Sequence, residues 1–235
     1  MVGLRAKLDL DFVKYMPSAH FSVVDWGVKT KSFPGKLDPP ITAEYAVKKP
    51  EDWEKLKPIR GNEGEYGMVL QSQKIAMKAL KGLVPLVQTV FSPLTSCLKL
   101  GGLEPLLNHL KDFPEKVHRG LEIVTETTRE FAVAAIREGA DGIFLASQMS
   151  NADRLTADMH REFVEKYDLV ILEAIRQDAW FNILHLHGAN AMIHEVLDYP
   201  VQVLNWHDRD SGPSLSEVRR LTQKCLLGGI GHGSV

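Results

Sequence analysis

Two histidines at the end of a short apolar segment are the residues of this chain best suited to chemistry. They are His185 and His187, in the stretch Asn182-Ile-Leu-His-Leu-His-Gly-Ala-Asn190. A β-strand turns residues i and i+2 to the same face, so both imidazoles are expected to point together, with Leu184 and Leu186 on the other face. Imidazole transfers protons near neutral pH and binds metals. The pair therefore predicts a site where this strand meets the following loop.

The next strand candidate repeats the design. In Val201-Gln-Val-Leu-Asn-Trp-His207, the side chains of Asn205 and His207 share one face, and the apolar residues between them share the other. Adjacent strands that become polar on one face at their carboxyl ends are typical of a parallel β/α enzyme with its site at that rim. His185 and His207 are therefore candidate catalytic residues, and Asn205 is a candidate substrate-binding residue.

The elements that position these residues alternate between strands and helices. Apolar runs predict strands at 11–16, 83–91 and 141–147, at the double-histidine segment, and at 201–207 and 225–230. Helical patterns fall at 65–80, 114–138, 156–177 and 191–197 and after Ser214, while 19–58 is mostly irregular apart from a short helix after Pro50. Four histidines on or beside the predicted helices are expected at the surface, namely His109, His118, His160 and His194.

This alternation is the β/α pattern of a parallel sheet. No Gly-x-Gly-x-x-Gly sequence follows a first strand, which disfavours a doubly wound nucleotide-binding sheet. Polar residues at successive strand ends favour a barrel instead, and a complete (β/α)8 TIM barrel takes about 250 residues. The class is therefore α/β, with an incomplete (β/α)8 barrel forming one domain over residues 1–235.

Composition narrows the classes of function. The chain carries 44% hydrophobic and 25% charged residues and a formal net charge of −2, which gives no electrostatic reason to bind nucleic acid. No apolar run is long enough for a membrane span, and no secretory signal is visible. The two cysteines, Cys97 and Cys225, lack metal-ligand spacing and are expected as free thiols. We expect a cytoplasmic protein without a membrane or nucleic-acid partner.

Several motifs in order resemble the uroporphyrinogen decarboxylase superfamily over nearly the whole chain. They are Asp11-Phe-Val-Lys-Tyr-Met-Pro17, Asp25-Trp-Gly27, Val84-Pro-Leu-Val-Gln-Thr-Val-Phe-Ser-Pro-Leu94, Gly139-Ala-Asp-Gly-Ile-Phe144, His185-Leu-His-Gly188 and Asn205-Trp-His207. The resemblance implies a (β/α)8 barrel. The superfamily includes decarboxylases of porphyrin biosynthesis and zinc-dependent methyltransferases that act with corrinoid proteins. Compared with this family, the chain is expected to span about strands two to seven, without the decarboxylases' arginine-rich loop or the last strand.

The resemblance offers a metal role for the two histidines. The methyltransferase branch has His-x-Cys at this place, and those two residues bind zinc. Here His187 replaces the cysteine, and imidazole remains a good zinc ligand. A third ligand would come from Asp11, Asp25, His207 or the absent last strand. The competing interpretation is that His185 and His187 only hydrogen-bond to neighbours at the rim.

Other site residues also follow from the resemblance. Asp11 resembles the aspartate with which the decarboxylases accept hydrogen bonds from pyrrole N–H groups and stabilise the protonated ring; a solvated carboxylate at a strand start is the alternative. Ser147 resembles a substrate-contacting serine, with a strand-end cap as the alternative. Asp25, in a motif expected to shape a loop, is a third substrate-binding candidate.

Three functions remain open at this stage. The leading expectation is a carboxy-lyase that decarboxylates a tetrapyrrole acetate side chain without a cofactor, with Asp11 stabilising the cation. The alternative is a methyltransferase in which zinc at His185 and His187 activates a thiol or other acceptor, with a corrinoid protein as partner. The last is a degenerate, non-catalytic barrel that binds a small molecule. A homodimer is a further expectation.

Overall fold

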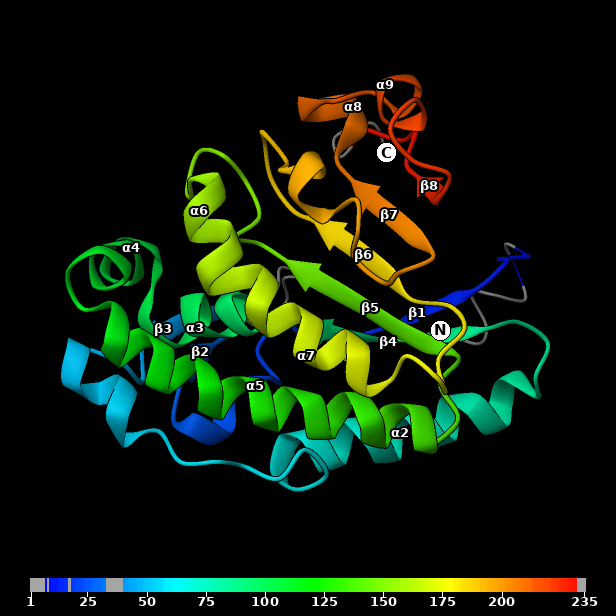
Figure 1. Ribbon diagram of the computed structural model, residues 1–235. Helices are drawn as coiled ribbons and strands as arrows, with labels where there is room; N and C mark the ends of the chain where they lie inside the picture. Colours follow the sequence, from blue (N-terminus) through cyan, green and yellow to red (C-terminus); the bar gives the residue numbers. More distant parts are fainter. Residues whose placement is uncertain (1–6, 8, 17, 33–39, 232–235) are drawn as a thin grey trace.

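The structure is a computed structural model that describes residues 7, 9–16, 18–32 and 40–231. Within these ranges, six strands form a curved sheet in the order β1-β4-β5-β6-β7-β8, and every neighbouring pair is parallel (Figure 1). This confirms the incomplete (β/α)8 barrel. The strands are β1 (Val13–Tyr15), β4 (Leu86–Phe91), β5 (Gly142–Ser147), β6 (Ile183–Leu186), β7 (Val203–Trp206) and β8 (Cys225–Leu227).

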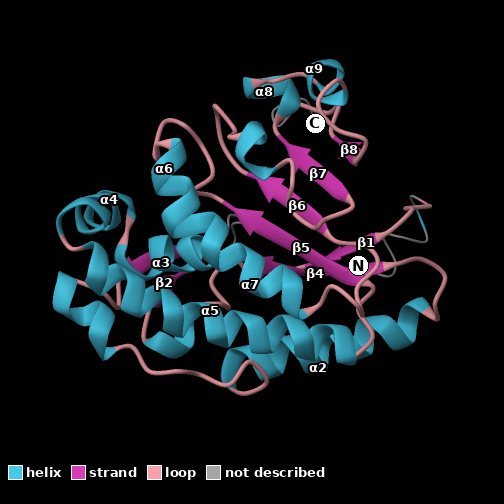
Figure 2. Ribbon diagram, viewed as in Figure 1, coloured by secondary structure: helices cyan, strands magenta, loops and turns pink. Residues whose placement is uncertain are grey.

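Helices α2 (Gly64–Leu80), α5 (Pro114–Arg137) and α7 (Lys166–Ala174) cover one face of this sheet (Figure 2). Apolar residues at helical spacing on α5 and α7 are buried against the strands and form the main core with them. The remaining helical segments are α3 (Pro93–Gly101), α4 (Leu103–Asp112), α6 (Ala157–His160), α8 (Asp208–Ser211), α9 (Leu215–Arg219), the short turns η1 (Val24–Trp26), η2 (Pro50–Lys55) and η4 (Ile193–Val196), and the π-helical η3 (Arg161–Glu165).

The register of the strands decides which side chains reach the uncovered face. Ala146 pairs with His185, His185 with Asn205, and Asn205 with Leu227. Residues paired in this way point to the same side of the sheet, so this row lies on the face away from the helices. The next row, which contains Ser147, Leu186 and Trp206, points toward the helical layer.

A second apolar cluster lies among the helices, beyond the sheet. Trp53 of η2 is fully buried there, against residues of α3, α4 and the first half of α5. Its indole N–H donates to Nδ1 of His109, 3.1 Å away. His109 is 8% exposed and His160 is 0% exposed, so both predictions of surface histidines were wrong, whereas His194 is exposed as expected. The reason is that α4 packs against α3 and α5, and that the ring of His160 turns inward to Ser150.

The segment 19–58 contains structure that the sequence pattern did not predict. Strands β2 (Lys29–Lys31) and β3 (Ile41–Glu44) pair antiparallel and form a separate two-stranded sheet. β2 is exposed along its whole length and lacks the alternation of apolar and polar residues that marks a half-buried strand. Among the described helices, none is long and apolar enough to cross a membrane.

Candidate functional site

Three histidines meet at the carboxyl ends of β6 and β7. His185 lies on β6, His187 follows it, and His207 follows β7, and one ring nitrogen from each lies within 4.8 Å of the others. The ring centroids of His187 and His207 are 4.8 Å apart, and that of His185 is 5.8 Å from His187 and 5.6 Å from His207. The convergence predicted from alternation on two adjacent strands is confirmed.

The backbone after β6 fixes the position of His187. Its amide N–H donates to the carbonyl of Ser147, 2.9 Å away, which continues the ladder between β5 and β6 past the end of the strand. Gly188 follows with a φ of +100°, and a Cβ there would lie 3.3 Å from Nδ2 of Asn151. Because side chains rarely adopt this conformation, glycine lets the chain turn away directly after the histidine.

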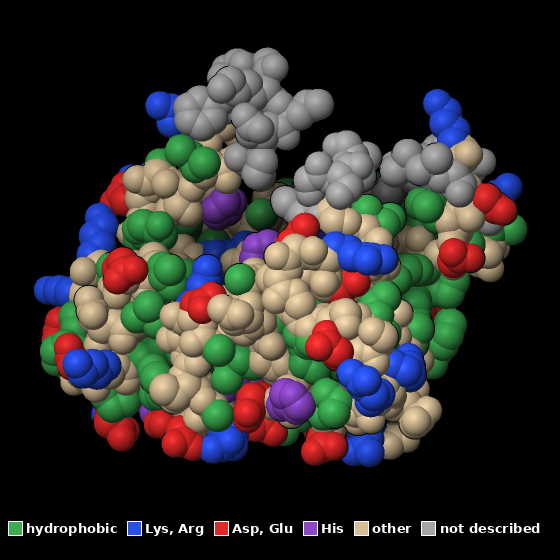
Figure 3. Space-filling view, turned by 90° about the horizontal axis from the view of Figure 1, so that it is seen from above, with side chains coloured by type: hydrophobic (Ala, Val, Ile, Leu, Met, Phe, Trp, Pro, Cys, Tyr) green, Lys and Arg blue, Asp and Glu red, His purple; other side chains and the backbone are tan. Residues whose placement is uncertain are grey.

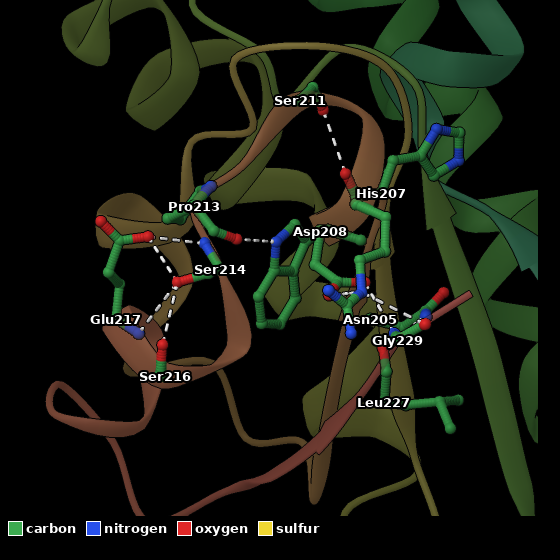
Figure 4. A network of polar contacts seen from close by, with 12 residues as sticks. Asn205, His207, Asp208, Ser211, Pro213, Ser214, Ser216, Glu217, Leu227 and Gly229 are labelled. Atoms are coloured by element: carbon green, nitrogen blue, oxygen red, sulfur yellow. Dashed lines mark hydrogen bonds and ion pairs between the residues drawn. The ribbon is translucent and has the colours of Figure 1, made fainter. Parts of the chain in front are cut away.

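Ser211 of α8 joins the two loops that carry His187 and His207. Its hydroxyl lies 3.3 Å from the carbonyl of Gly188 and 3.2 Å from that of His207. The buried carboxylate of Asp208 accepts the amide N–H of Gly229 at 2.8 Å, which ties the end of β7 to the segment after β8. Figure 4 shows the contacts of Ser211 with His207 and of Asp208 with Gly229, and the ring of His207 directed away from them.

Asn205 determines which nitrogen of His185 carries the proton. Its amide Nδ2 donates to the carbonyl of Leu227 at 2.7 Å, so its Oδ1 is the atom that faces His185, 2.6 Å from Nδ1. An amide oxygen only accepts hydrogen bonds, and therefore Nδ1 of His185 is the donor. In the neutral ring this leaves the lone pair on Nε2, the arrangement found in metal-ligating histidines held by a second shell.

The surroundings of His185 keep its ring neutral. Burial, together with the nearby His187, His207 and Lys14, lowers its pKa to about 4, although the hydrogen bond to Asn205 acts in the opposite direction. Its ring also stacks on Phe144, with centroids 5.2 Å apart. A neutral imidazole with a free Nε2 is what a metal requires of a histidine ligand.

The donor set fits a zinc ion. Zinc binds imidazole nitrogen at about 2.0–2.1 Å, and three protein ligands with one open position are typical of catalytic rather than structural zinc. The 4.8 Å limit on the nitrogen separations includes the spacing of about 3.3 Å that such bonds require in a tetrahedron. His185, His187 and His207 are therefore the residues able to hold the metal.

Two cavities adjoin the histidines. One of about 170 Å³ is lined from β1, β4, β5 and α3 and reaches His185 and His187. The other, of about 320 Å³, lies over β7 and β8 and is lined by His185, Asn205 and His207, together with Asp210. His185 lines both, so the histidines lie where the two cavities meet. Seen from above, histidine and lysine or arginine side chains lie close together in a hollow of the surface (Figure 3).

The smaller cavity contains two lysines that the sequence did not single out. Lys14 reaches it from β1, and Lys99 from α3. Burial lowers the pKa of Lys14, and lowers that of Lys99 to about 8. Phe12, Lys14 and Met16 occupy every second position of the first strand and so share one face of the sheet. This spacing is a signal that could have placed Lys14 on the same face as the histidines.

Asp11 is not brought to the histidines. It is exposed and precedes β1 by two residues, whereas the histidines lie at the carboxyl ends of strands parallel to β1. Parallel strands share their direction, so Asp11 lies at the amino ends of the strands, at the opposite end of the sheet from the histidines. Its side chain lines neither of the two cavities beside the histidines.

Ser147 and Asp25 also have partners elsewhere. Ser147 is 0% exposed, points toward the helices, and its hydroxyl lies 2.6 Å from that of Ser150. Asp25 accepts the amide N–H of Glu65 at 2.8 Å, at the amino end of α2, where a carboxylate is favoured by the helix dipole. The structure therefore does not place either predicted substrate-binding residue in the site. Ser147 is excluded because alternate residues of β5 point to opposite faces and it points toward the helices. Asp25 is engaged at the amino end of α2.

Known proteins that resemble the chain include two activities. It is 24% identical over 149 residues to the methylcobamide:CoM methyltransferase MtbA of Methanosarcina acetivorans, covering 63% of this chain and 44% of that protein. It is 28% identical over 127 residues to the uroporphyrinogen decarboxylase of Alcanivorax borkumensis, covering 52% and 35%. In each case the match spans less than half the length of the relative.

The fold agrees with these similarities. A solved structure described as a methyltransferase from Methanosarcina mazei superposes with a TM-score of 0.75 at 19% identity, over 86% of this chain and 59% of that one. The family model for uroporphyrinogen decarboxylase (URO-D) matches residues 5–232, nearly the whole sequence. The chain therefore belongs to the uroporphyrinogen decarboxylase family.

Proposed function

We propose that the protein is a zinc-dependent methyltransferase that transfers a methyl group from a corrinoid to a thiol. The observation that carries this proposal is the convergence of His185, His187 and His207, with ring nitrogens within 4.8 Å of one another. Zinc held there would act as a Lewis acid that lowers the pKa of a thiol acceptor. The methylcobamide named for the relative supports a corrinoid as the methyl donor.

The residues around the histidines have separate tasks in this function. Asn205 holds the Nδ1 proton of His185 and so directs the Nε2 lone pair to the metal site. Ser211 keeps the loops after β6 and β7 at a fixed distance, because its hydroxyl contacts a carbonyl on each. Phe144 and the buried strand residues around it exclude water on one side of His185.

The two cavities match a reaction with two substrates. The larger, of about 320 Å³, lies over β7 and β8; because a whole corrinoid is larger than this, the cavity would receive only the methyl-bearing part of the donor. The smaller, between β1, β4 and β5, suits a compact acceptor. His185 lines both, as a transfer between two bound molecules requires.

Decarboxylation of a tetrapyrrole is the competing activity, and the similar proteins include both methyltransferases and a decarboxylase. Our choice between the two activities rests on the geometry of the site. A decarboxylase needs a carboxylate beside the reacting pyrrole, and Asp11, the candidate for that role, is exposed before β1. The histidines that do converge offer ring nitrogens suited to a metal, and burial lowers the pKa of one of them, His185, to about 4.

Metal content measured by elemental analysis tests the proposal. We expect about one zinc per chain in the wild-type protein and in His194→Ala, which removes an exposed histidine outside the cluster. His187→Ala should lose both the zinc and methyl transfer from methylcobalamin to a thiol. Cobalt(II) substituted for zinc gives a second readout, because its absorption spectrum reports imidazole ligation in the absence of turnover.

The opposite outcome is equally defined. A metal-free wild-type protein that decarboxylates uroporphyrinogen, and for which Asp11→Asn is more damaging than His187→Ala, would overturn the methyltransferase proposal. Zinc retained at full occupancy in His187→Ala would overturn the assignment of the ligands.

A further inference from the structure

A carboxyl group is buried without a partner in the helical layer, on the side of the sheet away from the histidines. Asp168 of α7 is 0% exposed, and neither of its oxygens forms a hydrogen bond among the described residues. Buried carboxylates in proteins are usually paired with a positive charge, bonded to several donors or bound to a metal ion. The described contacts provide none of these for Asp168, so its environment points to a ligand.

Two hydroxyl groups near Asp168 are buried in the same way. They belong to Ser92, 0% exposed between β4 and α3, and to Tyr199, 1% exposed in the turn before β7, and neither forms a hydrogen bond among the described residues. Burial raises the pKa of Asp168 to about 7, and the hydroxyl of Ser92 acts against this rise. Burial also raises the pKa of Tyr199, and the charge of Asp168 adds to that effect. Three segments that are distant in the sequence therefore bring unpaired oxygens to one carboxyl group.

The electrostatic field at this cluster is negative. Glu165, one turn before Asp168, adds to the effect of burial in raising the pKa of that carboxyl. Glu165 and Glu195 also contribute to the raised pKa of Tyr199. Arg161 does not balance these charges, because its side chain is 54% exposed and already pairs with two carboxylates. Buried oxygens in a negative field attract a cation, and carboxylate and hydroxyl oxygens are the ligands that hard cations prefer.

We propose that Asp168, Ser92 and Tyr199 form a binding site for a monovalent cation, sodium or potassium. The carboxylate supplies the charge, and the two hydroxyls supply neutral oxygen ligands. One positive charge balances the one fully buried carboxylate, whereas a divalent ion would leave excess charge in a medium of low dielectric constant. The bound ion holds α7 to the end of β4 and to the turn before β7. The site does not depend on the proposed function, because the histidine cluster lies on the other face of the sheet.

A proton competes with the cation for the same carboxylate. Protonation neutralises Asp168 but supplies only one donor, whereas a cation contacts several oxygens at once, including those of the two hydroxyls. Because the pKa of Asp168 is about 7, the carboxylate is mainly ionised at pH 8 and mainly protonated at pH 6. Cation binding should therefore strengthen as the pH rises through this range.

The test compares thermal unfolding at pH 8 in sodium chloride, potassium chloride and choline chloride at equal ionic strength, with zinc kept at one concentration. Choline is too large for a buried site and controls for screening by salt. We expect sodium or potassium to raise the midpoint of unfolding by about 3–6 °C over choline, because the ion binds only the folded state. The difference should fall by at least half at pH 6. Asp168→Asn keeps the shape of the side chain without its charge and should abolish the difference, and Tyr199→Phe should reduce it.

A matched control and a direct readout complete the test. Asp178→Asn removes an exposed carboxylate and should keep the full difference between the salts. Thallium(I), which replaces potassium and scatters X-rays anomalously, should give a peak beside Asp168 in crystals of the wild-type protein. If Asp168→Asn does not fold, Tyr199→Phe and Ser92→Ala provide the same comparison. Equal midpoints in the three salts at pH 8, or a full difference in folded Asp168→Asn, would overturn the site and show that a proton alone neutralises the carboxyl group.

Discussion

His185 and His160 have similar titration properties and opposite surroundings. Burial lowers the pKa of each to about 4. Each forms a hydrogen bond with a neutral side chain, His185 with Asn205 at 2.6 Å and His160 with Ser150 at 3.0 Å. His185 lies on the uncovered face of the sheet and lines two cavities, whereas His160 is 0% exposed on the helical side, and its Nδ1 has no partner among the described residues.

The comparison teaches that a shifted pKa does not identify a functional histidine. Desolvation depresses the pKa of any buried imidazole, whether or not a ligand reaches it. What distinguishes His185 is convergence with two further imidazoles and access to a cavity. His160 instead closes a buried chain of hydroxyls through Ser150 to Ser147, so its role is to hold the helical layer against β5.

The largest expected difference is in the response to truncation of His160. His160→Ala should lower the free energy of unfolding by about 3 kcal/mol, because it creates a cavity and removes the partner of Ser150. Zinc affinity should not change, since His160 lies on the other side of the sheet from the cluster. Denaturant unfolding and zinc titration of the same sample check both parts. A stability loss below about 1 kcal/mol would contradict the structural role.

Truncating the hydrogen-bond partner of each histidine should separate zinc affinity from stability in the same way. Asn205→Ala should weaken zinc binding by about 10–100-fold, the effect typical of losing a second-shell partner. At 1.4 kcal/mol per factor of ten, this is about 1.4–2.8 kcal/mol. Ser150→Ala is the matched control and should leave zinc affinity unchanged while lowering stability by about 1–2 kcal/mol. Equal zinc affinities in the two variants would contradict the tautomer argument.

The sequence predicted the histidine cluster because the signal is local. Alternation within two short segments placed His185, His187, Asn205 and His207 on one face, and parallel neighbours brought the segments together. The six strands of the main sheet were predicted for the same reason, since each is a compact apolar run between turns or helices. The hairpin of β2 and β3 was missed because its exposed residues carry no such pattern.

The remaining site residues depended on register and packing, which are not local. β5 is buried on both faces, so its sequence does not reveal that Ser147 points toward the helices while Ala146 points toward His185. Lys99 lies in an apolar helix whose orientation follows from contacts with α5 and the loop at Ala19. His160 was expected at the surface, but it is 0% exposed and its Nε2 lies 3.0 Å from the hydroxyl of Ser150.

The smallest expected effect is the dependence of stability on pH that His160 produces. Its pKa is about 4 in the folded protein and about 6.5 in an unfolded chain, so between these values the unfolded state binds the additional proton. Its contribution is therefore intact above pH 6.5 and is lost as the pH falls toward 4. His185 acts in the same direction, while burial raises the pKa of Asp168 to about 7, so this carboxyl lowers stability as the pH rises toward that value.

Comparing wild type with His160→Gln isolates the effect of His160, because the contributions of His185 and Asp168 are the same in both proteins. Wild type should lose about 1 kcal/mol more than this variant between pH 7 and pH 5.5, measured by urea unfolding without metal. Parallel pH profiles for the two proteins would show that His160 is solvated, and the contrast with His185 would then have to be abandoned.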